Sequence, residues 1–141
     1  MERRIYIAYG EYMSIMQMAS KCVTAKRIGR GFLRHWRLSF HGEMGNGIEN
    51  IIPSHNDSVP VTLWDISLDD ERELDTRYEY PKRYTKIEVE AMYKGAAYKG
   101  YTYIINGNLP YATPSQELKD CMKEGYSDTG IDIKDWDPIF F

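Results

Sequence analysis

Residues 5–13 read Ile5-Tyr6-Ile7-Ala8-Tyr9-Gly10-Glu11-Tyr12-Met13, an apolar run that ends in a glycine and leads into a helix-like stretch. The apolar residues 5–9 predict a short buried strand, and the methionines and alanine of residues 13–20 recur at helical spacing. A strand–glycine–helix junction points backbone N–H groups and a helix N-terminus into one small volume, which suits anions and carbonyl oxygens. The junction predicts a small-molecule site, in which Glu11 is an unexpected acidic charge.

Length and composition indicate one globular domain that spans residues 1–141. A chain of 141 residues is large enough to bury a core without staples, and its 43% hydrophobic and 28% charged residues are ordinary for a globular protein. Residues 128–141 show no clear period, and we expect them to dock on the domain as a tail through their apolar side chains, Trp136, Ile139, Phe140 and Phe141. The net charge of −3 gives no electrostatic reason to expect nucleic-acid binding.

The cysteines, histidines and N-terminus set further expectations. Cys22 and Cys121 lie far apart without a CxxC motif, which favours two reduced thiols. The sequence has no apolar run of membrane-spanning length, and residues 1–4 lead directly into a strand rather than into a signal sequence. The three histidines lack metal-ligand spacing, so we expect no metal and no cofactor. We therefore predict a soluble cytoplasmic protein without membrane contact.

The rest of the chain predicts several consecutive strands with helices around them. Residues 26–40 alternate as a strand with a bulge at Gly29 and Gly31, and residues 41–50 form a glycine-rich loop. The further elements expected are a strand at 59–66, a helix at 68–75 capped by Ser67, a hairpin of strands 84–92 and 98–105, and a helix at 116–124 ended by Gly125. This order favours an α+β fold with a mixed or barrel-like sheet.

A basic cluster lies on the predicted strand of residues 26–40. Its members alternate with apolar residues: Lys26, Arg27, Arg30, Arg34 and Arg37. Alternation is typical of a strand with one solvated face. We interpret the cluster as the solvent face of a strand rather than a phosphate-binding groove.

A set of short motifs follows one another along the chain in an informative order. They are Tyr9-Gly10, Val59-Pro60-Val61-Thr62-Leu63-Trp64-Asp65-Ile66, Leu74-Asp75, Tyr80-Pro81, Tyr84, Tyr103-Ile104, Pro114-Ser115 and Gly125-Tyr126. Over about residues 4–127 this ordered set resembles the gamma-glutamylcyclotransferase-like family. The resemblance implies a small, partly closed β-barrel with flanking helices. It also implies a reaction in which the α-amine of a γ-glutamyl group attacks its own γ-carbonyl and releases 5-oxoproline and an amine or amino acid.

That reaction needs a base for the α-ammonium group and donors for the carbonyl oxygen. In the family the base is the glutamate of a Leu-Asp-x-x-Glu-Gly motif, whose position is Tyr78 here, followed by Glu79 in place of the glycine. A phenol with a pKa of about 10 is a poor proton acceptor at neutral pH. Glu79 becomes the candidate base if the backbone shifts by one residue, and otherwise it is a solvated loop carboxylate.

The glycine turn also departs from the family, because the family's Ser-Asn is Glu11-Tyr12 here. Three alternatives remain: Glu11 turns outward, the pocket accepts a cation or amine, or Glu11 itself is the base. By resemblance, the substrate-binding residues are Tyr9, Gly10, Glu11, Tyr12, Met13, Tyr84 and Tyr103. Tyr84 and Tyr103 have the simpler interpretation of ordinary strand tyrosines.

Two kinds of function therefore compete, with a third behind them. The first is an enzyme that cyclises a small-molecule γ-glutamyl compound or related amine. The second is an inactive family member that binds a small ligand or regulates a protein. The third is a protein–protein module that uses the aromatic tail, so a protein partner stays open. The first two are separated by whether Glu79 or Glu11, rather than Tyr78, reaches the barrel mouth beside the N–H groups of residues 10–13.

Overall fold

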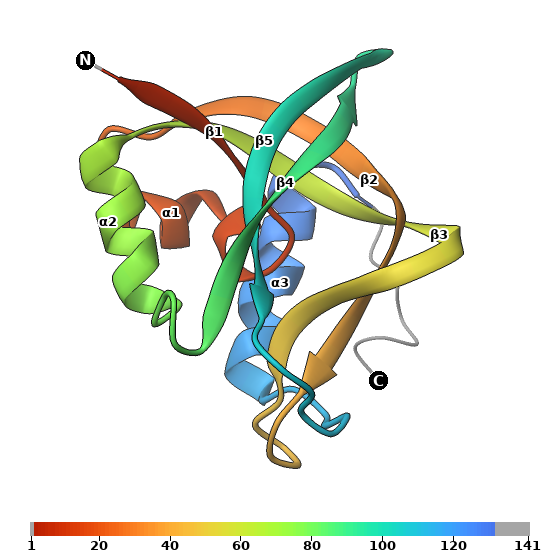
Figure 1. Ribbon diagram of the computed structural model, residues 1–141. Coiled ribbons are helices and arrows are strands. Elements are labelled where there is room, and N and C mark those ends of the chain that lie inside the picture. Colours follow the sequence, from red (N-terminus) through yellow and green to blue (C-terminus); the bar gives the residue numbers. More distant parts are fainter. Residues whose placement is uncertain (1, 132–141) are drawn as a thin grey trace.

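The computed structural model describes residues 2–131, so the predicted docking of the aromatic tail lies outside the described residues. Within these residues the chain folds into five strands and three α-helices, with a 3-10 turn after the first strand (Figure 1). The strands are β1 (Arg3–Ala8), β2 (Lys26–His41), β3 (Ile48–Ser67), β4 (Tyr84–Tyr93) and β5 (Ala96–Ile105). The helical elements are η1 (Glu11–Met13), α1 (Ile15–Lys21), α2 (Leu68–Arg77) and α3 (Gln116–Asp128).

The five strands form a closed barrel in the order β1-β3-β2-β4-β5. Four of the five pairs of neighbouring strands are antiparallel. The fifth pair is parallel and joins β1 to β5 at Tyr6↔Tyr101. The predicted α+β barrel with flanking helices is confirmed, and its sheet is closed rather than open at one side. Closure removes the free strand edges that would otherwise pair with other chains.

The helices lie beside the barrel and position its mouth. In Figure 1, α1 and α2 lie together at one side, while α3 runs behind β4 and β5. Ser67 caps α2 as predicted: its Oγ accepts a hydrogen bond from the Asp70 backbone N–H, and the Asp70 carboxylate accepts one from the Ser67 backbone N–H, each at 3.2 Å. None of the helices within residues 2–131 is long and apolar enough to cross a membrane.

The glycine-rich loop is shorter than predicted. Residues 48–50 belong to β3, whose partners on β2 include Ser39↔Asn50, Phe40↔Glu49 and His41↔Ile48. The sequence did not predict that β3 begins at residue 48, because three glycines between residues 42 and 47 lower the strand propensity next to its first paired residues. The predicted bulge near Gly29 is confirmed by the register shift between Arg27 and Gly29.

The prediction that Gly125 ends the last helix is wrong. Helix α3 continues to Asp128, with Gly125 buried inside it. A Cβ built at Gly125 would lie 2.7 Å from the Met13 Cβ and 2.8 Å from the Ser14 backbone nitrogen. The glycine is therefore required by close packing of α3 on η1, not by a helix end.

Gly125→Ala is expected to lower the free energy of unfolding by about 1 kcal/mol or more. Overpacking costs about 1–3 kcal/mol, whereas the better helix propensity of alanine returns only about 1 kcal/mol. Urea denaturation followed by circular dichroism measures the change. The matched control is Ser127→Ala on the exposed side of the same helix, which we expect to be neutral or slightly stabilising. A more stable Gly125→Ala variant would contradict the packing argument.

Candidate functional site

The glycine turn after β1 holds a carboxylate from a distant strand. The backbone N–H of Glu11 donates a hydrogen bond to the Glu49 Oε2 at 3.2 Å. A Cβ built at Gly10 would lie only 2.3 Å from the same oxygen. Gly10 is therefore the residue that lets the Glu49 side chain approach the turn.

Glu49 is a buried carboxyl with an altered pKa. It lies on β3 and is only 3% exposed. Its pKa is raised to about 7, chiefly by burial and next by the neighbouring Glu11 carboxylate, while the hydrogen bond from the Glu11 N–H partly opposes the rise. The Glu49 carboxyl therefore changes protonation near neutral pH.

Glu11 does not turn to solvent, so the first of the three alternatives for it is wrong. Its side chain is nearly buried and forms an ion pair with Arg77, with 2.6 Å between the Arg77 Nη2 and the Glu11 Oε1. Burial lowers the pKa of the Arg77 guanidinium, but Glu11 and Glu49 more than offset this, so its pKa is raised overall. Arg77 thus stays charged and neutralises Glu11 beside Glu49.

Tyr78, at the position of the family's base, directly follows α2 and is buried among other tyrosines. Its ring stacks on Tyr103 with 4.4 Å between ring centroids and meets Tyr84 edge-on at 4.8 Å. Burial raises the pKa of the Tyr78 phenol well above its ordinary value. The phenol is therefore protonated at neutral pH, and its ring fills the space where a base would be expected.

Glu79 points away from the glycine turn. It is about half exposed, has a positive φ of 48° and pairs with Arg83 at 3.2 Å. It borders a separate cavity of about 630 Å3 together with His41 and Lys82. The one-residue backbone shift that would bring Glu79 to the turn does not occur.

The tyrosines expected to bind substrate are brought together, but as buried, hydrogen-bonded groups. The Tyr9 hydroxyl donates to the Tyr103 carbonyl and the Tyr84 hydroxyl donates to the Glu49 carbonyl, each at 2.6 Å. The Tyr103 hydroxyl donates to Asp75, 2.6 Å away. The Tyr84 bond holds the strand that carries Glu49, whereas the other two tie β5 to the glycine turn and to α2.

The remaining two residues of the expected binding set are also buried. The Tyr12 carbonyl accepts a hydrogen bond from the Trp64 indole at 2.9 Å. Met13 is fully buried and faces the close contact with Gly125. Of the expected set, only Glu11 lines the cavity beside the turn.

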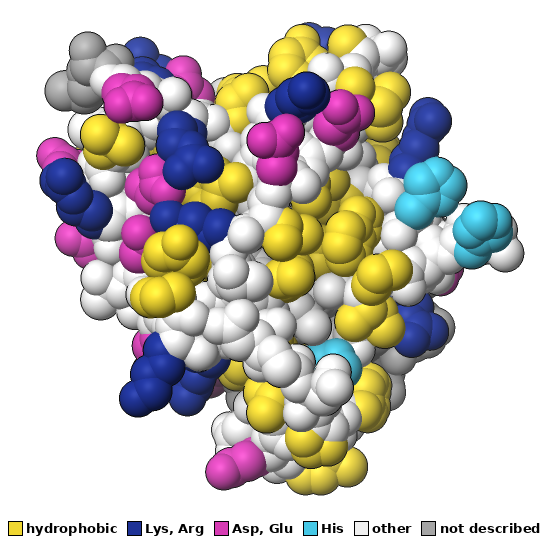
Figure 2. All heavy atoms as spheres, in the orientation of Figure 1, with side chains coloured by type: hydrophobic (Ala, Val, Ile, Leu, Met, Phe, Trp, Pro, Cys, Tyr) yellow, Lys and Arg dark blue, Asp and Glu magenta, His cyan; other side chains and the backbone are white. Residues whose placement is uncertain are grey.

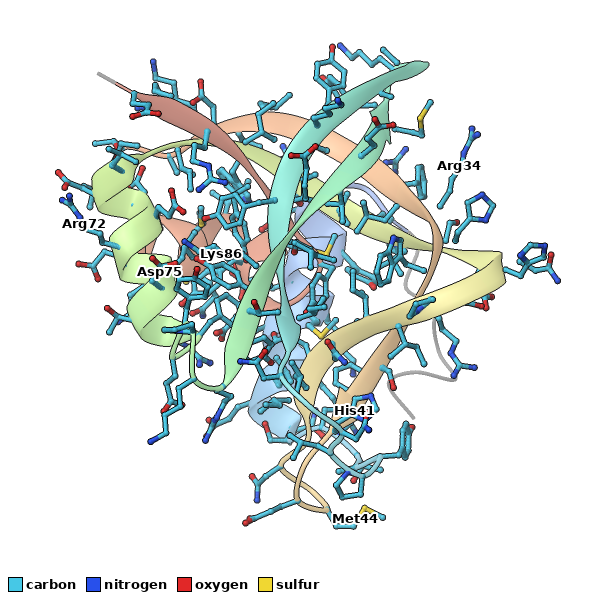
Figure 3. The ribbon with its side chains drawn as sticks, in the orientation of Figure 1. Arg34, His41, Met44, Arg72, Asp75 and Lys86 are labelled. Carbon is cyan, nitrogen blue, oxygen red and sulfur yellow. The ribbon has the colours of Figure 1, made fainter. Side chains whose placement is uncertain are left out.

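A charged network behind the tyrosines ties α2 to the barrel. Figure 3 shows Asp75 on α2 and Lys86 on β4 lying close together, and their charged groups are 2.8 Å apart. The Lys86 ammonium also lies 2.6 Å from Glu71. On the face in Figure 2, acidic and basic side chains are interspersed over α2 rather than gathered by sign. The network positions the helix end that carries Arg77 and Tyr78.

The cavity beside the glycine turn has a volume of about 540 Å3 and an acidic lining. Its charged members are Arg77 and four carboxylates, Glu11, Glu49, Glu117 and Asp120. The rest of its wall comes from α1, the start of β3 and α3: Gln17, Asn46, Gly47, Ile48, Ser115, Leu118 and Cys121. Because Arg77 is paired with Glu11, this lining favours a ligand with a positive charge.

Sequence reasoning missed Glu49 because it assigned residues 41–50 to a loop. If the strand is extended back from Ile51, alternation places Glu49 on the inward side with Ile51, and both are buried. The signal that could have identified Glu49 is an acidic residue at a strand position whose side chain alternation points inward. Within residues 2–131, no group of three His, Cys, Asp or Glu residues is arranged to hold a metal ion.

The stability of the protein is expected to fall between pH 4.5 and pH 8 relative to Glu49→Gln. The folded-state pKa of Glu49 is raised from 4.5 to about 7, so the folded state holds this proton more tightly than the unfolded state. The stabilisation that protonated Glu49 gives the folded state is fully present below pH 4.5 and is lost as pH rises through about 7. This stabilisation amounts to about 3 kcal/mol. Urea denaturation of both proteins across this range measures the difference, and parallel stability curves would contradict it.

The comparisons with known proteins agree with this barrel. The family model described as gamma-glutamyl cyclotransferase, AIG2-like matches residues 6–136. A solved structure named gamma-glutamyl cyclotransferase is 21% identical, with a TM-score of 0.88, and the match covers 98% of this chain and 86% of that one. A crystal structure of an uncharacterized protein from Homo sapiens has the same identity and TM-score over 99% of this chain and 87% of that one.

A third structure extends the likeness to a longer chain. The YkqA protein of Bacillus subtilis is 15% identical with a TM-score of 0.82, and the match covers 95% of this chain and 51% of that one. A search of curated proteins found no match. At these identities the solved structures support the fold, while the family model spans nearly all of the described barrel and both sides of the glycine turn. This chain therefore belongs to the gamma-glutamyl cyclotransferase, AIG2-like family.

Proposed function

We propose that this protein cyclises a γ-glutamyl amine or γ-glutamyl amino acid to 5-oxoproline, with Glu49 as the base. The observation that carries the proposal is the buried Glu49 carboxyl on the N–H of the glycine turn, at the edge of the acidic cavity. A pKa of about 7 suits a group that must accept a proton at neutral pH and give it back.

The proposed reaction balances without a cofactor. The Glu49 carboxylate takes a proton from the α-ammonium, and the α-nitrogen then forms a bond to the γ-carbonyl carbon. The carbonyl oxygen becomes an oxyanion, for which the Glu11 backbone N–H is a donor once Glu49 turns to the amine. When the bond to the leaving nitrogen breaks, Glu49 returns this first proton there and takes the second proton from the α-nitrogen as the carbonyl re-forms. The released amine then accepts the second proton from Glu49 and leaves as an ammonium ion. Overall two protons move from the α-nitrogen to the leaving nitrogen.

The geometry favours Glu49 over the bases expected from the sequence. Glu79 faces solvent and pairs with Arg83, and the Tyr78 phenol is buried and protonated. Glu11 lies beside Glu49, but its carboxylate is held in an ion pair with Arg77. We assign Glu11 and Arg77 the role of positioning and tuning Glu49.

The cavity's charge supports an amine as the leaving group. Four carboxylates against one paired arginine favour a conjugate whose far end carries a cation, such as a γ-glutamyl diamine. A conjugate with an acidic leaving group meets repulsion in the same cavity. We expect kcat/KM to be higher for cationic than for acidic leaving groups.

The test is release of 5-oxoproline, measured by chromatography, from a panel of γ-glutamyl amines and γ-glutamyl dipeptides. Release that prefers cationic leaving groups supports the proposal. Failure of the whole panel would overturn the enzymatic function.

A second candidate function is a binding module that has lost cyclisation. The observation that favours it is Tyr78, whose ring fills the position of the family's base. In that case the same γ-glutamyl amines would raise the melting temperature without being consumed. A thermal-shift series with 5-oxoproline assayed in the same wells separates the two candidates.

The cytoplasmic location expected from the sequence stays a prediction.

A further inference from the structure

Another cavity, distinct from the two described above, is strongly basic. It has a volume of about 610 Å3 and lies where β2 meets the β4–β5 hairpin. Its cations are Arg27, Arg30, Arg34 and Lys94, and among the described residues its lining contains no aspartate or glutamate. The exposed ring of Phe32 adds an apolar surface. We call this cavity the basic groove.

The basic groove arises from the way β2 and β4 cross. A Cβ built at Gly29 would lie 2.5 Å from the Tyr93 ring, and one built at Gly31 would lie 2.5 Å from the Met92 carbonyl oxygen. The two strands therefore approach closely at the glycines, while Arg34 projects outward from β2 near the hairpin (Figure 3). The basic residues of β2 are exposed, as the sequence predicts, but three of them, Arg27, Arg30 and Arg34, line a groove rather than a plain strand face.

The chain leaves its last helix at the edge of this groove. The carbonyl of Asp128 accepts a hydrogen bond from Arg27 at 3.2 Å. The carbonyls of Thr129 and Gly130 accept bonds from Arg30, each at 3.3 Å. Thr129 itself lines the groove. Two groove arginines therefore hold the chain at residues 128–130, close to the end of the described residues.

We propose that the basic groove binds residues 132–141 of the same chain. That segment reads Asp132-Ile133-Lys134-Asp135-Trp136-Asp137-Pro138-Ile139-Phe140-Phe141, with three aspartates against one lysine. Its acidic residues match the four cations of the groove, and its apolar residues match Phe32. The segment is the natural occupant because it is tethered at the rim.

Length and tethering both support this occupant. Extended, ten residues span up to about 33 Å, which exceeds what is needed to enter an adjoining groove. A short tether gives an effective concentration on the order of mM, so even an affinity on the order of mM suffices for half occupancy. A separate acidic peptide lacks this advantage.

The test is zero-length cross-linking of the full chain with a carbodiimide, which joins an amine to a carboxylate with loss of water. Peptide mapping by mass spectrometry is expected to find Lys94 joined to Asp132, Asp135 or Asp137. Lys99 on the same hairpin lies outside the groove and serves as the internal comparison. Lys94→Arg keeps the charge and removes the amine, so it should abolish the cross-link.

Charge reversal tests whether the groove itself is responsible. Arg34→Glu is expected to lower the Lys94 cross-link yield about tenfold, because repulsion replaces attraction at the groove wall. Arg37→Glu, an exposed position on the same strand that does not line the groove, is the matched control. Equal yields at Lys94 and Lys99, or no loss in Arg34→Glu, would overturn the proposal. So would cross-links that form only between isotopically labelled and unlabelled copies.

Discussion

Glu49→Gln is expected to lower kcat/KM for 5-oxoproline release by about 10²- to 10⁴-fold, the usual contribution of a general base. Glutamine keeps an oxygen that can accept the hydrogen bond from the Glu11 N–H, but it cannot take a proton from the α-ammonium group. The substrate should still bind, so the loss should fall mainly on kcat. Steady-state kinetics with a cationic γ-glutamyl amine measures both parameters.

Stability measurements separate loss of chemistry from loss of structure in this variant. Above pH 7 Glu49→Gln should be more stable than the natural protein, because it removes a buried charge. The matched control is Glu90→Gln, an exposed glutamate on β4, which should leave kinetics and stability unchanged. Full activity in Glu49→Gln would eliminate Glu49 as the base.

Tyr78→Ala is expected to lower the free energy of unfolding by about 3–5 kcal/mol, as for other buried aromatic residues cut back to alanine. The Tyr78 side chain is 4% exposed, and its ring contacts Tyr103, Tyr84 and Tyr12. Its removal leaves a cavity lined by rigid rings that cannot collapse. Urea denaturation measures the loss.

Two comparison variants show whether the ring or the hydroxyl of Tyr78 matters. Tyr78→Phe removes only the contact with the Tyr6 hydroxyl, which is long at 3.3 Å, so it should cost about 1 kcal/mol or less and keep the kinetics. Tyr111→Ala, at a largely exposed tyrosine, should change stability by about 0.5 kcal/mol or less. A Tyr78→Phe variant that folds but loses 5-oxoproline release would instead make the phenol catalytic.

The fold could be predicted well because its signals are local. The run that ends at Tyr9-Gly10 predicted β1 and its turn, and Ser67 predicted the start of α2 through its capping bonds. The two strand-like runs at 84–92 and 98–105 predicted the β4–β5 hairpin, whose turn residues Lys94 and Gly95 both have positive φ. Each of these depends on a few neighbouring residues, so one sequence carries the information.

The site could be predicted only in part because it depends on contacts between distant residues. The glycine turn is local, but its partner Glu49 lies 38 residues away in a stretch that looks like a loop. Gly125 gave a misleading local signal, since its reason is the approach of Met13 from the other end of the chain. The inward or outward direction of Glu79 follows from a positive φ that no residue type required.

The pairing of Gly10 with Glu49 bears on how members of this family are sorted. A survey that scores only the motif at the end of the second helix classes a chain with tyrosine there as inactive. A second kind of survey asks for glycine at the turn and glutamate at the facing position of the long third strand. It separates chains that lack any glutamate for the proposed role of base from chains that have one on that strand. Under the proposed function, a chain that lacks the helix-end glutamate but has the facing glutamate is expected to be active, and a chain that lacks both is expected to be a pseudoenzyme.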